Sequence, residues 1–412
     1  MIFDTRPKKY VRSMSATERF SLAINELYRY NIVALAEGQG SLTKDELQAA
    51  VNIAAEKNPG ARVRLKSVLG FSKWKDSGIA PLVHEIQTPH WDCFSEQGAD
   101  FMEGSFDIHG NGPVCDLYLI PDNTDDSGNG SHAIRIVVRV LHAAMDARGL
   151  QHFVKDIFRV LRGEEPLGST STLTDYDVRI KFKEKIQGQQ VEMECMPILP
   201  PSPRQNGKDE KLAYVWRRAI VDKNIGSMLP KMAIFLAQHA RKHGEGEVGF
   251  TIPVDLRGLR EEINTTANMT GYLRVKVEPD ATAKNVMQQI NQGIKAHLDC
   301  IIPPIFKWVP WIPVSMLVKD MRKNLDLLLY AKNKVIPSGG IVSMGMFKPE
   351  DYSCPKFHAT TCIGIPGSVG KMNVVIMNHT DHTEVVFSTP AAFNKEGQLD
   401  RLIEEFRQTM SA

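Results

Sequence analysis

Strand-like and helix-like segments alternate through both halves of this 412-residue chain, and this alternation limits the folds open to it more than any other feature. In the first half, an apolar run at 132–141 is followed by apolar residues at steps of three and four between 150 and 161, as on one face of a helix. In the second half, a helical pattern at 231–243 precedes strand patterns at 248–253 and 272–277. The pattern in each half therefore predicts an α/β architecture, with helices layered on a sheet.

Shorter signals place further elements. The segments 15–18 and 43–46 are capping boxes, in which a hydroxyl and a glutamate each accept a hydrogen bond from a backbone amide where a helix starts. Strands are expected at 30–36 and 61–69, and a β-hairpin at 372–387. No short-period repeat is present, so a solenoid is not expected.

The chain is longer than one hydrophobic core usually organises, which favours two domains. Residues 196–211, MPILPPSPRQNGKDEK, combine prolines, glycine and charge as a linker does. We therefore predict an N-terminal subdomain at 1–195, a linker at 196–211 and a C-terminal subdomain at 212–412.

Composition and local sequence argue against a disordered, nucleic-acid-binding, secreted or membrane-spanning protein. Apolar residues make up 42% of the chain and charged residues 24%, as in ordinary folded soluble proteins. The formal charge of +2 gives no reason to expect a nucleic-acid partner. The N-terminus lacks the apolar core of a secretory signal, and four prolines interrupt the most apolar stretch, 300–318. A cytoplasmic protein without a transmembrane segment is expected.

No metal site or disulfide framework is expected. The six cysteines are scattered and form no CxxC pair. His379 and His382 lie where the hairpin should turn, and no third ligand is evident near them, so a turn is favoured over a metal site.

The segment that points to chemistry is LHAAMDARG, residues 141–149, where an apolar strand gives way to a helix. A histidine on such a loop can be held rigidly at a cleft and can act as a general base near neutral pH. Asp146 would orient the His142 ring or anchor the loop. The alternative is that His142 only satisfies a strand end and that Asp146 only caps the helix at Ala147.

This segment resembles the HHxxxDG signature of a superfamily that includes chloramphenicol acetyltransferase, the condensation domains of nonribosomal peptide synthetases, and polyketide-associated and wax ester acyltransferases. The resemblance extends over nearly the whole chain. It implies that His142 is catalytic and Asp146 structural. Two positions depart from the signature: Leu141 replaces the first histidine, and Ala147 replaces the glycine.

Other segments support the resemblance. Arg62 occupies the place of an arginine that pairs with the motif aspartate, which implies an ion pair between Arg62 and Asp146. Residues 253–257 and 268–272 are similar to elements beside the family's active-site tunnel. Ser343, in a strand similar to a later family element, is a candidate contributor to the tunnel or the oxyanion site; a hydroxyl bonded within the sheet is the alternative. The DFGWG element of the plant branch is absent from the sequence.

The resemblance implies two chloramphenicol-acetyltransferase-like subdomains in a V, with His142 inside a tunnel between them. The acyl donor would be acyl-CoA or a phosphopantetheinyl carrier protein, and the acceptor a small-molecule amine or alcohol, in secondary or lipid metabolism. No permanently bound cofactor is implied. A freestanding enzyme is expected because no adenylation or carrier segment is recognised. The alternative is a catalytically silent protein that binds carrier proteins or scaffolds a synthase.

Two surface features are left open. Trp308 and Trp311, among prolines, are expected to pack on the core. The alternatives are contact with a membrane or an acyl chain, and a hydrophobic lip on the tunnel. The basic stretch 179–185 is expected to be a solvated face of a strand or helix, with docking of an acidic carrier protein as the alternative.

Overall fold

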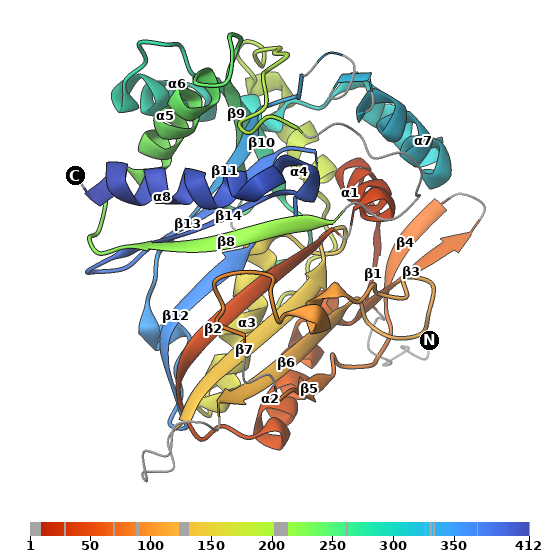
Figure 1. Ribbon diagram of the computed structural model, residues 1–412. Coiled ribbons are helices and arrows are strands. Elements are labelled where there is room, and N and C mark those ends of the chain that lie inside the picture. Colours follow the sequence, from red (N-terminus) through yellow and green to blue (C-terminus); the bar gives the residue numbers. More distant parts are fainter. Residues whose placement is uncertain are drawn as a thin grey trace.

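The strands of the protein form three sheets, with helices packed on the two larger ones (Figure 1). A computed structural model describes residues 10–28, 30–68, 71–87, 91–122, 132–201, 213–260, 263–325, 327–328, 332, 334–368 and 370–411. The arrangement confirms the predicted mixed α/β architecture.

The five-stranded sheet has the order β12-β2-β7-β6-β5. Its strands are β2 (Asn31–Gly40), β5 (Val83–Glu85), β6 (Cys115–Asp122), β7 (His132–Leu141) and β12 (Phe357–Ile365). Helices α2 (Lys44–Lys57) and α3 (Ala147–Leu161) pack on each other and share one hydrophobic core with this sheet. As predicted, a capping box starts α2, and the apolar stripe of α3 is buried.

The six-stranded sheet has the order β10-β9-β11-β13-β14-β8. Its strands are β8 (Tyr214–Val221), β9 (Gly249–Asp255), β10 (Thr270–Lys276), β11 (Gly339–Met346), β13 (Met372–Asn378) and β14 (Thr383–Pro390). Around it lie α5 (Met228–Arg241), α6 (Ala283–Lys295) and α8 (Gln398–Ser411), and α8 runs along β8 (Figure 1). The predicted hairpin is β13 and β14.

The third sheet, β1-β4-β3, is small. It contains β1 (Val11–Ser13), β3 (Val63–Val68) and β4 (Phe71–Asp76). Three more helices complete the fold: α1 (Ala16–Leu27), which starts with the predicted capping box, α4 (Asp175–Phe182) and α7 (Val314–Leu325). None of the helices in the described ranges is long and apolar enough to cross a bilayer.

One strand crosses between the two halves. Although β12 comes from the second half of the chain, it pairs antiparallel with β2 of the first half. Gly38 and Gly40 permit this approach because they have no side chain. A Cβ on Gly38 would lie 2.2 Å from the His358 carbonyl oxygen in β12, and one on Gly40 would lie 2.0 Å from the Lys356 carbonyl oxygen just before it. The sequence did not predict this strand.

The packing does not change at the predicted boundary near residue 195. Met193, Cys195, Met196, Ile198 and Leu199 are all buried in the core of the six-stranded sheet. The start of the predicted linker, 196–199, is therefore part of the second half, because its apolar side chains fill that core. Residues 202–211 of the predicted linker lie outside the described residues, and the division of the chain into two subdomains stays a prediction.

Candidate active site

The loop at 142–146 connects β7 to α3, as the sequence predicts. Asp146 is the N-cap of α3, and its side chain accepts a hydrogen bond from the Gly149 amide. Leu141, in place of the signature's first histidine, is fully buried in a core cluster beside the small sheet. An apolar side chain fits there because this position faces the core rather than a cleft.

Two contacts fix the His142 ring. Its Nδ1 lies 3.2 Å from the Met145 carbonyl oxygen, and the ring stacks on Tyr30 with centroids 4.6 Å apart. A carbonyl only accepts, so this contact assigns the proton to Nδ1 and leaves a lone pair on Nε2. The backbone amide of His142 also donates to the Tyr30 carbonyl, at 3.1 Å. The ring is therefore held in the tautomer that a general base needs.

Burial lowers the pKa of His142, because the imidazolium form would lose hydration. The backbone hydrogen bonds and the nearby Asp146 carboxylate oppose this shift only in part. His142 is therefore neutral, and able to accept a proton, at neutral pH.

Asp146 joins the two halves of the chain. Its carboxylate accepts from the Gly149 and Met269 amides, both at 2.7 Å, and from the Thr270 hydroxyl at 3.2 Å. Arg257 donates to both of its oxygens, at 3.0 and 3.1 Å. Burial alone would raise the pKa of Asp146, but Arg257 and the amide donors outweigh it and lower that pKa. A buried, ionised aspartate of this kind is an anchor rather than a proton donor.

The partner of Asp146 corrects the sequence-based interpretation, which paired it with Arg62. Arg62 donates instead to Asp76 of β4, at 2.6 Å. Arg62 comes directly before β3, which pairs with β4, so the register of the small sheet brings its side chain to Asp76. Arg257 lies in the 253–257 segment that was assigned to the tunnel wall, and no local signal marked it as the partner of Asp146.

Arg257 is itself held on several sides. Its guanidinium donates to the carbonyls of Thr265 and Ala267, at 2.9 and 2.6 Å, and to the Asp255 carboxylate at 2.9 Å. The planar fork thus meets two carboxylates and two carbonyls at once, which a lysine could not do. The 265–270 segment is bound in this way to the loop that carries His142.

A second buried cation supports this loop from behind and was missed in the sequence. Arg12 donates to the Ala144 carbonyl at 2.9 Å and forms a fully buried ion pair with Glu18. Burial raises the pKa of Glu18 to about 7, although Arg12 opposes the shift. The carbonyl of His142 in turn accepts a hydrogen bond from Asn268, at 3.4 Å.

His142 lies in the wall of a cavity of about 710 Å³ to which both large sheets contribute. Its lining includes Tyr30, His142, Thr270, Tyr272, Ser343 and Cys362. The predicted Ser343 thus reaches the same cavity as His142. Arg148 of α3 donates to the carbonyl of Met344, at 3.3 Å, and so ties β11 to the start of α3.

Two other expectations meet different outcomes. His379 and His382 lie at the turn between β13 and β14, as predicted, but a third possible ligand is near both. Glu384 Oε1 lies 3.4 and 3.3 Å from their Nε2 atoms, while Arg218 binds its other oxygen. The reason given against a metal site was therefore wrong, and the absence of a metal stays a prediction.

The basic stretch 179–185 also differs from the expectation at its first residue. Arg179 is buried and donates hydrogen bonds to three backbone carbonyls, so the expected solvated face does not begin there.

Neither a protein-family model nor a curated protein matches the sequence. Solved structures do match over almost the whole chain. A mutant starter condensation domain of rhizomide synthetase, in complex with C8-CoA and Leu-SNAC, is 14% identical with a TM-score of 0.63, and the match covers 98% of this chain and 94% of that one. Trichothecene 15-O-acetyltransferase from Fusarium sporotrichioides is 13% identical with a TM-score of 0.59, and 98% and 95% are covered.

The chain has the fold of these two proteins. This agrees with the chloramphenicol-acetyltransferase-like fold predicted from the sequence. At these identities the likeness extends to the fold alone.

Proposed function

We propose that this protein is an acyltransferase that moves an acyl group from a CoA or carrier-protein thioester to a small-molecule hydroxyl or amine. The observation that carries the proposal is His142: its Nδ1 is bound to a carbonyl, and its ring lines a cavity shared by both sheets. One structural neighbour was crystallised with C8-CoA and another is an O-acetyltransferase, which supports the choice of chemistry.

The proposed reaction is a direct displacement. Nε2 of His142 takes the proton from the acceptor as its oxygen or nitrogen attacks the thioester carbonyl. The tetrahedral intermediate then collapses, the carbon–sulfur bond breaks, and the imidazolium returns its proton to the departing thiolate. Ser343, in the wall of the same cavity, is our candidate donor to the oxyanion.

The cysteines do not favour a covalent acyl-enzyme. All six are buried. Cys362 lines the cavity, but burial raises the pKa of its thiol to about 12, so it is not a thiolate at neutral pH. The proposed mechanism therefore uses no cysteine nucleophile.

The test is turnover with panels of acyl thioesters and of alcohol and amine acceptors, read by mass spectrometry. The wild type should form an ester or amide, and His142→Ala should abolish the product without lowering the thermal unfolding temperature by more than a few degrees. His358→Ala, an exposed histidine of β12, is the matched control and should keep full activity. Unchanged turnover by His142→Ala would contradict the mechanism. A wild type that binds carrier proteins but forms no product would favour the alternative of a catalytically silent binding protein.

A further inference from the structure

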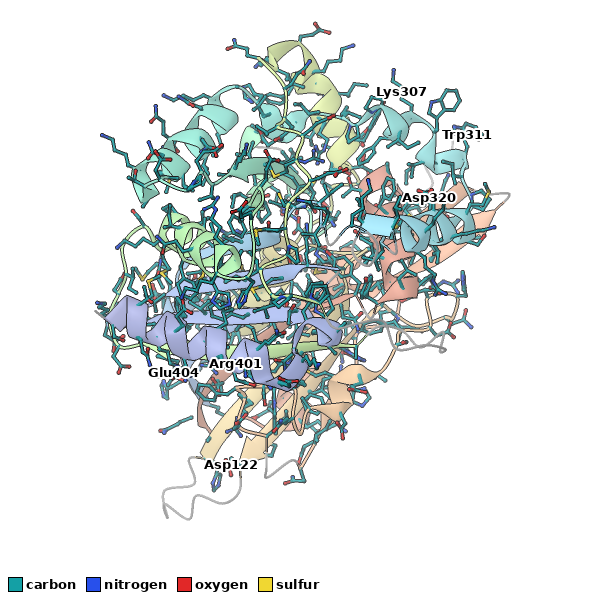
Figure 2. The ribbon with its side chains drawn as sticks, turned by 45° about the horizontal axis from the view of Figure 1, so that its top comes forward. Asp122, Lys307, Trp311, Asp320, Arg401 and Glu404 are labelled. Carbon is teal, nitrogen blue, oxygen red and sulfur yellow. The ribbon has the colours of Figure 1, made fainter. Side chains whose placement is uncertain are left out.

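Four large apolar side chains within residues 305–316 are exposed. Ile305, Trp308, Trp311 and Met316 are 46, 65, 67 and 61% exposed, and we call them the tryptophan patch. The expectation that the two tryptophans pack on the core is therefore wrong. Figure 2 shows Trp311 and Lys307 projecting outward from the same side of the molecule. Exposed tryptophans grouped in this way mark an interaction surface more often than a lone exposed leucine does.

The segment that carries the patch is held in place from behind. Val309, between the two tryptophans, is fully buried, and the Phe306 ring lies 5.6 Å from Phe20 of α1. Arg19 of α1 donates to the Ile312 carbonyl at 2.7 Å. Residues 304–307 and 309–311 form 3-10 turns with proline at their starts. The tryptophans therefore face solvent because the backbone is fixed with them outward.

Basic side chains outnumber acidic ones in the segment that carries the patch. Residues 301–325 contain four basic side chains and one acidic one, Asp320. On α7, Lys319, Asp320 and Lys323 follow Met316 at helical steps of three, four and seven, and all three are exposed, so lysines outnumber the one acidic residue on this face. Lys307 is also exposed, next to Trp308. Indole rings among lysines suit the boundary between lipid headgroups and acyl chains, where each ring has an apolar body and a polar N–H.

We propose that the tryptophan patch binds reversibly to the surface of an anionic lipid bilayer. The tryptophans insert at the level of the headgroups, and Lys307, Lys319 and Lys323 face lipid phosphates. A bilayer is favoured over a protein partner because no patch residue lines the described cavity, and because Trp311 projects beside Lys307 from a rigid segment, which suits a soft, flat, anionic surface (Figure 2).

Helix α7 also borders the cavity. Asp320, Met321, Asn324 and Leu325 are among the lining residues. On a membrane, the cavity wall would therefore lie beside the lipid. If the proposed function holds, an apolar acyl thioester or acceptor would pass between bilayer and cavity around α7; the binding itself does not depend on that function.

Tryptophan fluorescence gives a direct test. The chain has five tryptophans, and the other three, Trp74, Trp91 and Trp216, are 0, 2 and 2% exposed. Vesicles of phosphatidylcholine and phosphatidylserine that contain brominated lipid should quench the emission of Trp308 and Trp311, whereas vesicles of phosphatidylcholine alone should bind less. Added salt should weaken binding, because it screens the lysines. An absence of quenching and of cosedimentation at low salt overturns the proposal.

Variants assign the binding to the patch. Trp308→Ala with Trp311→Ala should weaken cosedimentation by about tenfold per tryptophan. Reversing the charge of Lys319 or Lys323 should weaken it by at least about fivefold each. The matched control is Leu82→Ala with Leu167→Ala, two leucines elsewhere that are 59 and 66% exposed. Equal weakening of cosedimentation in the control would overturn the proposal. So would a tryptophan variant that loses acyl transfer from a carrier protein when the wild type binds no vesicles, because the patch would then bind a protein.

Discussion

His142 depends on its neighbours for the protonation state that the proposed reaction needs. Met145 fixes the proton on Nδ1, and burial disfavours the charged ring. Both effects act in the same direction, because a base must be unprotonated before it can accept a proton. The sequence predicted the histidine, but not that the Met145 carbonyl would fix its tautomer.

The pH dependence follows from this setting. The pKa of His142 is lowered from 6.5, so the active neutral form should persist to a lower pH than for a free histidine. With an alcohol acceptor, which does not itself titrate in this range, kcat/KM should be level above pH 6.5 and fall as the pH drops through the lowered pKa. The measurement is a pH–rate profile, and an apparent pKa above 6.5 would contradict the assignment.

The corrected ion pair can be tested with two arginine variants. Arg257→Ala should lower the free energy of unfolding by about 3–5 kcal/mol, because it leaves the buried Asp146 carboxylate without its cation. It should also lower turnover, since the same contact holds the His142 loop. Arg257→Lys keeps the charge but not the planar fork, so its stability and turnover should lie between those of the wild type and Arg257→Ala.

Arg62→Ala is the control. It removes an ion pair with Asp76 outside the site, so turnover should be retained even where stability falls. Urea unfolding and steady-state kinetics together make the comparison. A larger loss of turnover in Arg62→Ala than in Arg257→Ala would restore the pairing first inferred from the sequence.

At the scale of elements, the sequence predicted what is local. The capping boxes of α1 and α2 and the buried stripe of α3 depend on residues within a few positions of one another, so their spacing reveals them. Strand β12 and the Arg257–Asp146 pair depend on partners more than one hundred residues away, and nothing in their immediate sequence marks those partners. The first residues of the predicted linker, 196–199, are buried, because the prediction gave more weight to the prolines and polar residues of 196–211 than to Met196, Ile198 and Leu199.

The contact between α3 and the 265–270 segment is close enough to test by adding one methyl group. A Cβ on Gly149 would lie 2.1 Å from the Thr266 carbonyl oxygen, a backbone atom that can yield only if the segment moves. Gly149→Ala should therefore lower stability by about 1–3 kcal/mol, despite the better helix propensity of alanine, and should reduce kcat/KM.

Gly112→Ala is the matched control, because its added Cβ would meet nothing within 4 Å. Its thermal unfolding temperature and its kcat/KM should equal those of the wild type. If Gly149→Ala behaves like the control, the close approach of α3 to this segment is not required for activity.

For the molecule as a whole, Arg218 of β8 links the two large sheets. It is 5% exposed and binds Glu37 of β2 and Glu384 of β14. Arg218→Met should lower the free energy of unfolding by about 3–5 kcal/mol, because two carboxylates lose the cation between them. Chemical denaturation measures the change.

Arg217, the next residue, provides the comparison. It pairs with Glu96 and with the half-exposed Asp400, so solvent can replace its partners. Arg217→Met should cost about 1 kcal/mol or less. Equal costs for the two variants would mean that the junction of the sheets contributes no more than a surface ion pair.

The strand exchange at β12 also bears on protein engineering. Suppose that the first half were joined at 202–212 to the second half of a related protein. Its strand β2 would then meet a foreign β12, and Gly38 and Gly40 would face a backbone for which they were not selected. Specificity could therefore be recombined only if residues 357–365 travelled with the first half, so the unit of exchange is a set of paired strands rather than a continuous stretch of chain.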